Sequence, residues 1–152
     1  MSRSMVLLLF LVLVVGGGLA IGYITLPGEW YASLIKPSFN PPNWIFAPTW
    51  TILYVLIALA GWRVWDRDLT SSQQCWWAQL ALNFLWSPSF FGFHQMGLAL
   101  IVIVMLLVSI IGFIKVSWNA DRTSAILFLP YLAWVAFATL LNASLYWLNP
   151  AG

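Results

Sequence analysis

The sequence predicts an all-α membrane protein in which a single domain, residues 1–152, forms a bundle of five transmembrane helices. Hydrophobic residues make up 62% of the chain and charged residues only 7%, whereas a soluble domain carries about 25% charged residues. In water, a domain of this size would expose more surface than so few polar side chains can cover. The chain also holds five apolar runs that approach or exceed the roughly 20 residues needed to cross a bilayer.

The predicted spans are residues 5–26, 45–65, 74–93, 97–118 and 123–147. The first follows Arg3 as a signal peptide would, but its apolar run exceeds the roughly 7–15 residues of a signal core and no A-x-A site follows. The second has Pro48 in its first turn, where the missing N–H costs little. The fourth is an unbroken apolar run. The third and fifth contain Pro88 and Pro130, which we expect to bend their helices.

The distribution of basic residues predicts the orientation. With five spans, five of the six basic residues fall on the side of the N-terminus, and they are Arg3, Arg63, Arg67, Lys115 and Arg122. Only Lys36 falls on the other side. In a bacterial membrane this bias places the N-terminus in the cytoplasm and makes the chain a multi-pass integral membrane protein.

Residues 27–44 form the predicted extramembrane loop, which is rich in aromatic rings and prolines. Prolines stiffen a loop and remove backbone donors. Two interpretations are open. The loop is either an ordinary interfacial connector or a lid over a pocket, with the ammonium group of Lys36 available to an anionic ligand group.

Several classes of function are disfavoured. The basic residues are scattered, which argues against nucleic-acid binding, and no metal-binding cluster or phosphate loop occurs. We predict no metal, no required cofactor and no catalytic residue. No charged residue lies in the middle of a span, which argues against ion-coupled transport and against acid–base catalysis within the bilayer.

Tryptophan and glycine carry further signals. Many of the 11 Trp residues stand where spans end and predict an interfacial aromatic belt, namely Trp30, Trp44, Trp62, Trp65, Trp76, Trp77, Trp118 and Trp147. Gly18 and Gly22 form a G-x-x-x-G motif, which lets helices approach closely within the bundle or between subunits.

Three predicted helices each place aromatic and hydrogen-bonding side chains on one face at helical spacing. The three stripes are Trp50, Tyr54 and Ile57; Gln79, Asn83, Trp86 and Phe90; and Tyr131, Trp134, Ala138 and Asn142. Such groups are tolerated in a membrane when they point inward. Two interpretations remain open at this point. The amides either join helices by hydrogen bonds, or the rings and amides form a pocket for a flat ligand.

Four blocks of the sequence resemble the motifs of a known family. These blocks are WYASLIKPSFNPP (30–42), PTWTILY (48–54), QLALNFLWSPSFF (79–91) and PYLAWVAFATLLN (130–142). In this order and in a chain of this size, they resemble the TspO/MBR family of tryptophan-rich sensory proteins and translocator proteins (peripheral-type benzodiazepine receptors).

The resemblance implies a five-helix bundle, commonly a homodimer, that binds porphyrins such as protoporphyrin IX and haem, together with other planar hydrophobic molecules. The ligand-binding residues carried over from the family are Tyr31, Trp50, Tyr54, Asn83, Trp86, Trp134, Phe137 and Ala138. The inward stripes select most of the same residues.

Sterol-binding relatives carry an L/V…Y…K/R pattern at the end of the last helix. Here Ala143 and Trp147 stand where the Tyr and the basic residue would be, so cholesterol is not an expected ligand through this pattern. The leading hypothesis is therefore a membrane receptor or sensor that binds porphyrins and mediates their transport. The alternatives are light-dependent porphyrin degradation, by resemblance, and a facilitator of small apolar solutes.

Overall fold

The computed structural model describes residues 1–150, and over that range it consists of helices and loops without a β-strand. The helices in chain order are α1 (Arg3–Leu11), the π-helical turn η1 (Val12–Gly16), α2 (Gly17–Ile24), α3 (Gly28–Ser33), the 3-10 turn η2 (Asn43–Ile45), α4 (Phe46–Asp66), α5 (Thr70–Ser87), the π-helical turn η3 (Pro88–Gly92), α6 (Met96–Ser117), α7 (Arg122–Leu127) and α8 (Leu129–Leu148).

Four helical stretches are long and apolar enough to cross a membrane, and they are Arg3–Ile24, Asn43–Asp66, Met96–Ser117 and Arg122–Leu148. They correspond to the first, second, fourth and fifth predicted spans. The helix over α5 and η3 is not among them, and its first five residues, 70–74, are all Thr, Ser or Gln. The prediction of an all-helical membrane protein is confirmed, while the crossing by α5 stays a prediction.

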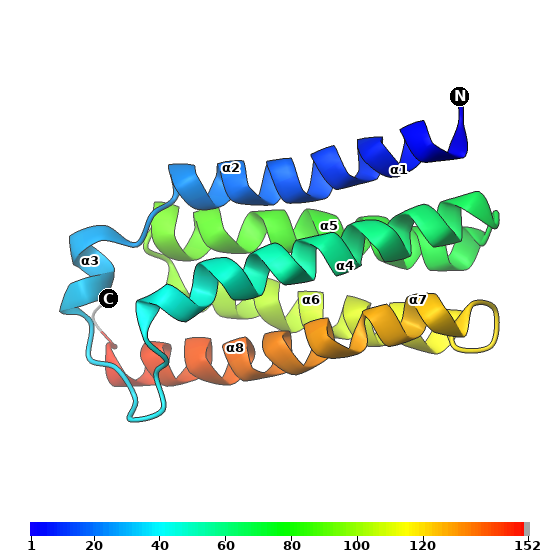
Figure 1. The fold of residues 1–152 in the computed structure, drawn as a ribbon. Helices are drawn as coiled ribbons and strands as arrows, with labels where there is room; N and C mark the ends of the chain where they lie inside the picture. Colours follow the sequence, from blue (N-terminus) through cyan, green and yellow to red (C-terminus); the bar gives the residue numbers. More distant parts are fainter. Residues whose placement is uncertain (151–152) are drawn as a thin grey trace.

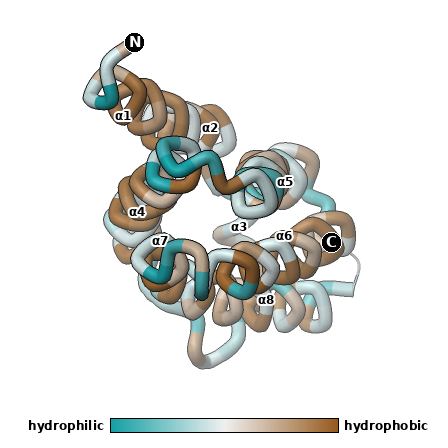
Figure 2. Tube along the Cα trace, turned by 90° about the vertical axis from the view of Figure 1, so that its right-hand side faces the viewer, coloured by the Kyte–Doolittle hydropathy of each residue, from teal (hydrophilic) through white to brown (hydrophobic). Residues whose placement is uncertain are grey.

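The helices run side by side, and the two termini lie at opposite ends of the molecule (Figure 1). Seen along the bundle, α1–α2, α4, α7–α8, α6 and α5 follow one another around a ring (Figure 2). Helix α6 packs along both α5 and α8, whereas α4 packs closely on α1 and α7 but only sparsely on α8. The predicted loop 27–44 contains the short helix α3 and lies at the end of the bundle where α8 finishes.

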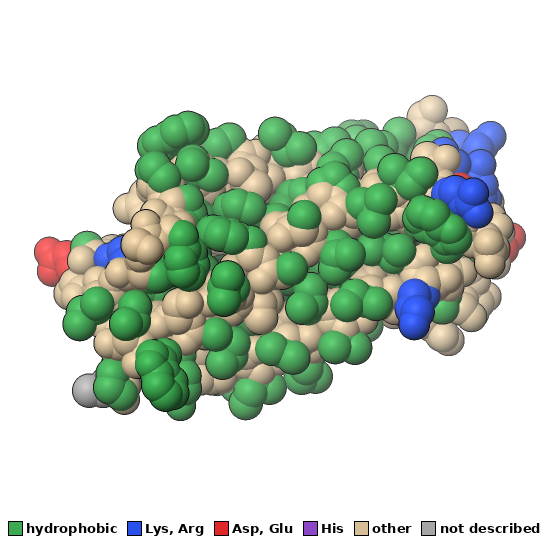
Figure 3. Space-filling view, turned by 90° about the horizontal axis from the view of Figure 1, so that it is seen from below, with side chains coloured by type: hydrophobic (Ala, Val, Ile, Leu, Met, Phe, Trp, Pro, Cys, Tyr) green, Lys and Arg blue, Asp and Glu red, His purple; other side chains and the backbone are tan. Residues whose placement is uncertain are grey.

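Charged side chains occupy the two ends of the face drawn in Figure 3, with hydrophobic side chains between them. At one end Arg3 pairs with Asp66 at 2.6 Å, and Arg63 donates two hydrogen bonds of 3.0 Å to Asp121. Burial favours a higher pKa for Asp121, but the hydrogen bonds from Arg63 and Ser124 and nearby arginine charges outweigh it and hold that pKa below its ordinary value. The second ion pair joins α4 to the start of α7.

Both intramembrane prolines stand where regular α-helical structure is interrupted, while the predicted bends stay a prediction. Pro130 lies in the first turn of α8, directly after the break at Phe128 that separates α7 from α8. Pro88 ends the regular α-helical hydrogen bonding of α5 and begins the π-helical turn η3. Both interruptions lie in helices whose inward faces carry the predicted site residues.

Trp76 corrects the aromatic-belt prediction, because it lies in the core. Its side chain is 1% exposed, and its Nε1 donates a 2.9 Å hydrogen bond to the carbonyl of Ile57. The indole lies against Gly61 of α4, where a Cβ would lie 2.5 Å from Cζ2 of the ring. The sequence placed Trp76 near a helix end, but the absence of a side chain at Gly61 allows it to turn inward.

Only one glycine of the G-x-x-x-G motif is in close contact. A Cβ at Gly18 would lie 2.5 Å from Cε2 of Tyr54, whereas nothing lies within 4 Å of the corresponding position at Gly22. Within residues 1–150 the motif therefore serves packing inside the bundle through Gly18, and Gly22 faces outward.

Candidate functional site

An aromatic cluster lies in the bundle where α4 faces α8. The Trp50 ring stacks on Tyr54 at 5.6 Å between ring centres, and it meets Tyr131 and Trp134 edge-on at 6.4 and 6.5 Å. Residues three or four apart lie on the same face of a helix, so Trp50 and Tyr54 share one face of α4, and Tyr131 and Trp134 share one face of α8. The sparse packing between these two helices leaves room for the large rings.

An open groove of about 460 Å³ runs between α4 and α8 beside this cluster. It is lined by Thr49, Ile52, Leu53, Pro130, Ala133, Trp134 and Phe137. The groove is open to the outer surface of the bundle, where Ile52 is 62% exposed, and its lining is predominantly apolar. Phe46 extends the cluster at the loop end through an edge-on contact of 5.8 Å with Trp134.

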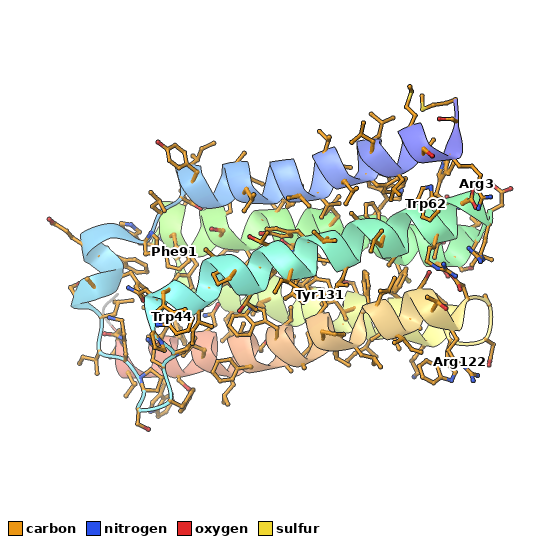
Figure 4. The ribbon with its side chains drawn as sticks, in the orientation of Figure 1. Arg3, Trp44, Trp62, Phe91, Arg122 and Tyr131 are labelled. Atoms are coloured by element: carbon orange, nitrogen blue, oxygen red, sulfur yellow. The ribbon has the colours of Figure 1, made fainter. Side chains whose placement is uncertain are left out.

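A chain of hydrogen-bonded side chains joins α5 to α8 inside the bundle. Nδ2 of Asn83 donates to the hydroxyl of Tyr131 at 2.7 Å, and this hydroxyl donates to Oε1 of Gln79 at 2.8 Å. Tyr131 lies near the middle of the bundle in Figure 4. These bonds are interhelical ties of the kind predicted for Gln79 and Asn83.

A second tie lies closer to the loop end. Nε1 of Trp86 donates to Oδ1 of Asn142 at 2.9 Å, and Nδ2 of Asn142 donates to the carbonyl of Met96 at 3.1 Å. Three helices, α5, α8 and α6, therefore meet through one amide. Buried polar groups in a membrane need such partners, because lipid offers none.

Two buried donors have no hydrogen-bond partner among the described residues. They are Nε2 of Gln79, whose side chain is fully buried, and Nε1 of Trp134. An unpaired buried donor costs about 1–3 kcal/mol, and such groups call for an explanation that includes function. Of these two residues, Trp134 lines the groove and Gln79 does not.

The predicted ligand-binding residues divide into two regions. Trp134 and Phe137 line the groove, Trp50 and Tyr54 complete the aromatic cluster, and the buried Ala138 packs in the same core. The other three do not line the groove. Asn83 belongs to the tie with Tyr131, Tyr31 packs with Phe90 and Phe91 near the loop, and Trp86 packs against both this core and that second cluster. The structure therefore joins four of the eight, Trp50, Tyr54, Trp134 and Phe137, through ring contacts beside the groove between α4 and α8.

The predicted list omitted two residues that this geometry makes prominent. Tyr131 bridges Asn83 and Gln79 and contacts Trp50, and the stripe that selected Trp134 already contained it. Gln79 contributes a free donor, and it shared the stripe of Asn83. Hydrogen-bonding capacity combined with a position on an inward stripe was the available signal.

The loop residues are engaged with their own segment. Nζ of Lys36 donates to the carbonyls of Tyr31, Ala32 and Leu34 at 2.8, 3.3 and 3.2 Å, and it lies 4.7 Å above the Tyr31 ring. It therefore caps the end of α3 in this structure and does not extend toward the interior. Burial raises the pKa of Tyr31, and its hydrogen bond to Asn40 opposes that rise.

No three His, Cys, Asp or Glu side chains within residues 1–150 are grouped in a way that could hold a metal ion. The groups that this region offers are aromatic rings and hydrogen-bond donors.

Comparison with known proteins agrees with the sequence blocks. The sequence pattern of the TspO/MBR family matches residues 9–148. Protein CrtK of Rhodobacter capsulatus is 40% identical over 136 residues, which cover 86% of this chain and 85% of the relative. The tryptophan-rich sensory protein of Cereibacter sphaeroides is 36% identical over 98% of this chain and 95% of its own length. The translocator protein of Homo sapiens is 39% identical, over 75% and 71% respectively.

Proposed function

The chain belongs to the TspO/MBR family, and from this premise we propose that it is an integral membrane receptor or sensor that binds porphyrins and similar flat hydrophobic molecules inside its bundle. The names of its relatives, sensory protein and translocator protein, support a membrane sensor or transporter. Protoporphyrin IX and haem are the proposed ligands, and their transport is the proposed consequence of binding.

One observation carries the proposal. The aromatic cluster around Trp50 adjoins a groove of about 460 Å³, and the indole N–H of Trp134 is buried there without a partner. Aromatic walls favour flat conjugated guests, because offset stacking adds to the gain from burial. A free donor favours a guest that carries an acceptor atom, such as a carbonyl or carboxylate oxygen.

The membrane topology forms part of the proposal. We propose that α5 crosses the bilayer as the third of five spans, since its polar residues Gln79 and Asn83 are buried inside the bundle. The N-terminus then lies in the cytoplasm of a bacterial cell, on the side of Arg3 and Arg122, which share one end in Figure 4. We further propose a homodimer, as the family resemblance implies.

The test is a titration of protoporphyrin IX into protein held in lipid nanodiscs, followed by the porphyrin absorbance spectrum, with empty nanodiscs as the baseline. Wild type should show saturable binding. Trp50→Ala and Trp134→Ala should each weaken it about tenfold or more, as expected when a central aromatic contact is removed. Trp134→Phe helps to separate the two roles of this residue, because it keeps a smaller aromatic ring and removes the N–H donor.

Trp65→Ala is the matched control. Trp65 lies on α4 like Trp50, but it is 44% exposed at the other end of the helix, so its removal should leave affinity unchanged. Absence of saturable binding in wild type would refute the proposed function. Equal porphyrin affinities in wild type, Trp50→Ala and Trp134→Ala would show that the ligand binds outside this cluster.

A further inference from the structure

The extended segment between α3 and α4 is fastened to the end of α8 by one side chain, that of Asn149. Oδ1 of Asn149 accepts a hydrogen bond from the backbone N–H of Ile35 at 2.9 Å, and Nδ2 donates to the carbonyl of Ile35 at 2.9 Å. Nδ2 also donates to the carbonyl of Leu145, at 2.9 Å, in the last turn of α8. Two residues that are 114 positions apart are therefore joined by a reciprocal pair of hydrogen bonds.

Asparagine suits this position because of its hydrogen-bonding groups. A primary amide offers one carbonyl acceptor and two N–H donors, and here the acceptor and both donors are used. In extended backbone the N–H and C=O of one residue point to the same side, so the amide pairs with Ile35 much as a residue of a neighbouring β-strand would. Aspartate would lose both donors and place a carboxylate beside two carbonyl oxygens.

The hydrogen bonds to Asn149 matter because the segment makes few other hydrogen bonds to the rest of the chain. Pro37, Pro41 and Pro42 supply no N–H, and the ammonium group of Lys36 is bound within the segment itself. Within residues 1–150, the hydrogen bonds that join residues 27–42 to other parts of the chain go to Asn149, apart from a local turn bond in which the N–H of Ile45 donates to the carbonyl of Pro42.

Ring contacts also attach α3 and this segment to the bundle. Phe39 meets Phe137 of α8 edge-on at 6.1 Å, Tyr31 meets Phe91 at 5.5 Å, and Trp30 stacks on His94 at 4.2 Å. Through Phe137 the segment reaches a residue that lines the groove between α4 and α8. Apolar contacts tolerate sliding, whereas a reciprocal hydrogen-bond pair has one geometry, so the Asn149 pair determines where the segment sits.

We propose that Asn149 is a positioning residue, a latch that holds residues 34–42 closed over this end of the bundle and slows ligand exchange with the interior. The effect on ligand exchange rests on the proposed function, while the latch itself does not. Ile35 is 62% exposed and Asn149 is partly exposed, so water can replace both bonds. A latch of this kind opens readily without unfolding the bundle.

The first experiment is hydrogen exchange of the full chain in nanodiscs, read at the backbone amide of Ile35. In Asn149→Ala this amide should exchange about tenfold faster, as expected for loss of its hydrogen bond and of the reciprocal bond. In Asn149→Asp exchange should be at least as fast, because the donors are lost although the side-chain size is kept. Ser144→Ala is the control, since Ser144 bonds only to Leu140 of its own helix. Unchanged Ile35 exchange in both Asn149 variants would overturn the latch.

The second experiment measures the association and dissociation rates of protoporphyrin IX. A latch that only controls access raises both rates by a similar factor, about three- to tenfold here, and leaves Kd nearly unchanged. Faster Ile35 exchange with unchanged ligand rates would overturn the control of access. If wild type fails to bind the porphyrin, the proposed function fails, and Ile35 exchange still decides the latch.

Discussion

The two glycines of the G-x-x-x-G motif allow a paired test of helix packing in this bundle. Gly18 is buried against the ring of Tyr54, whereas Gly22 is exposed with open space around it. Both lie in α2, so Gly18→Ala and Gly22→Ala introduce the same methyl group into the same helix. We expect Gly18→Ala to be the less stable of the two variants.

The magnitude follows from the distances. A Cβ at Gly18 would lie 2.5 and 2.8 Å from two carbon atoms of the Tyr54 ring, about 1 Å inside ordinary contact. The ring is buried and stacked on Trp50, so it cannot move aside freely, and overpacking of this kind costs about 1–3 kcal/mol. Replacing glycine by alanine inside a helix gains up to about 1 kcal/mol. This gain is shared by both variants and cancels in their difference, which should be about 1–3 kcal/mol.

The assay is equilibrium unfolding in mixed micelles with increasing denaturing detergent, followed by circular dichroism. Because Tyr54 touches Trp50, Gly18→Ala should also weaken porphyrin binding, whereas Gly22→Ala should not. Equal stability of the two variants would refute the assignment of Gly18 to packing inside the bundle. If both variants were less stable than wild type by the same amount, the motif would act as a unit on an outer surface.

Two further predictions concern the polar ties. Tyr131→Phe leaves the amides of Gln79 and Asn83 without their shared partner and should lower unfolding free energy by about 1–3 kcal/mol, measurable by the same assay. Asp121→Asn breaks the buried pairing with Arg63 and should cost about 2–3 kcal/mol at neutral pH. The pKa of Asp121 is lower in the folded state than in the unfolded state. The ionised carboxylate therefore stabilises the fold fully above the unfolded-state pKa of about 3.9. This stabilisation is lost as the pH falls through the folded-state pKa of Asp121. Wild type should therefore lose stability below about pH 4, and Asp121→Asn should lack that component; a variant with the wild-type acid profile would contradict the assignment.

The helices and their inward faces were readable from the sequence because both depend on local spacing. Apolar runs of about 20 residues favour membrane helices, and polar side chains within them must avoid lipid. Gln79, Asn83 and Asn142 are all buried as this reasoning requires. The same reasoning left open which partner each amide would bind, and Tyr131, which joins two of them, was absent from the predicted site list.

Contacts between distant parts of the chain depend on how far apart the helices stand and how each is rotated, and no local pattern encodes either quantity. The inward turn of Trp76 requires the missing side chain of Gly61 on another helix, and the groove beside Trp134 requires α4 and α8 to separate where α4 and α7 do not. The pairing of Asn149 with Ile35 likewise forms only after the bundle brings the end of α8 beneath the loop. Composition and periodicity thus specify a membrane bundle with inward aromatic and polar side chains, while the packing of side chains from separate helices decides where the groove between α4 and α8 lies and which residue fastens the loop to α8.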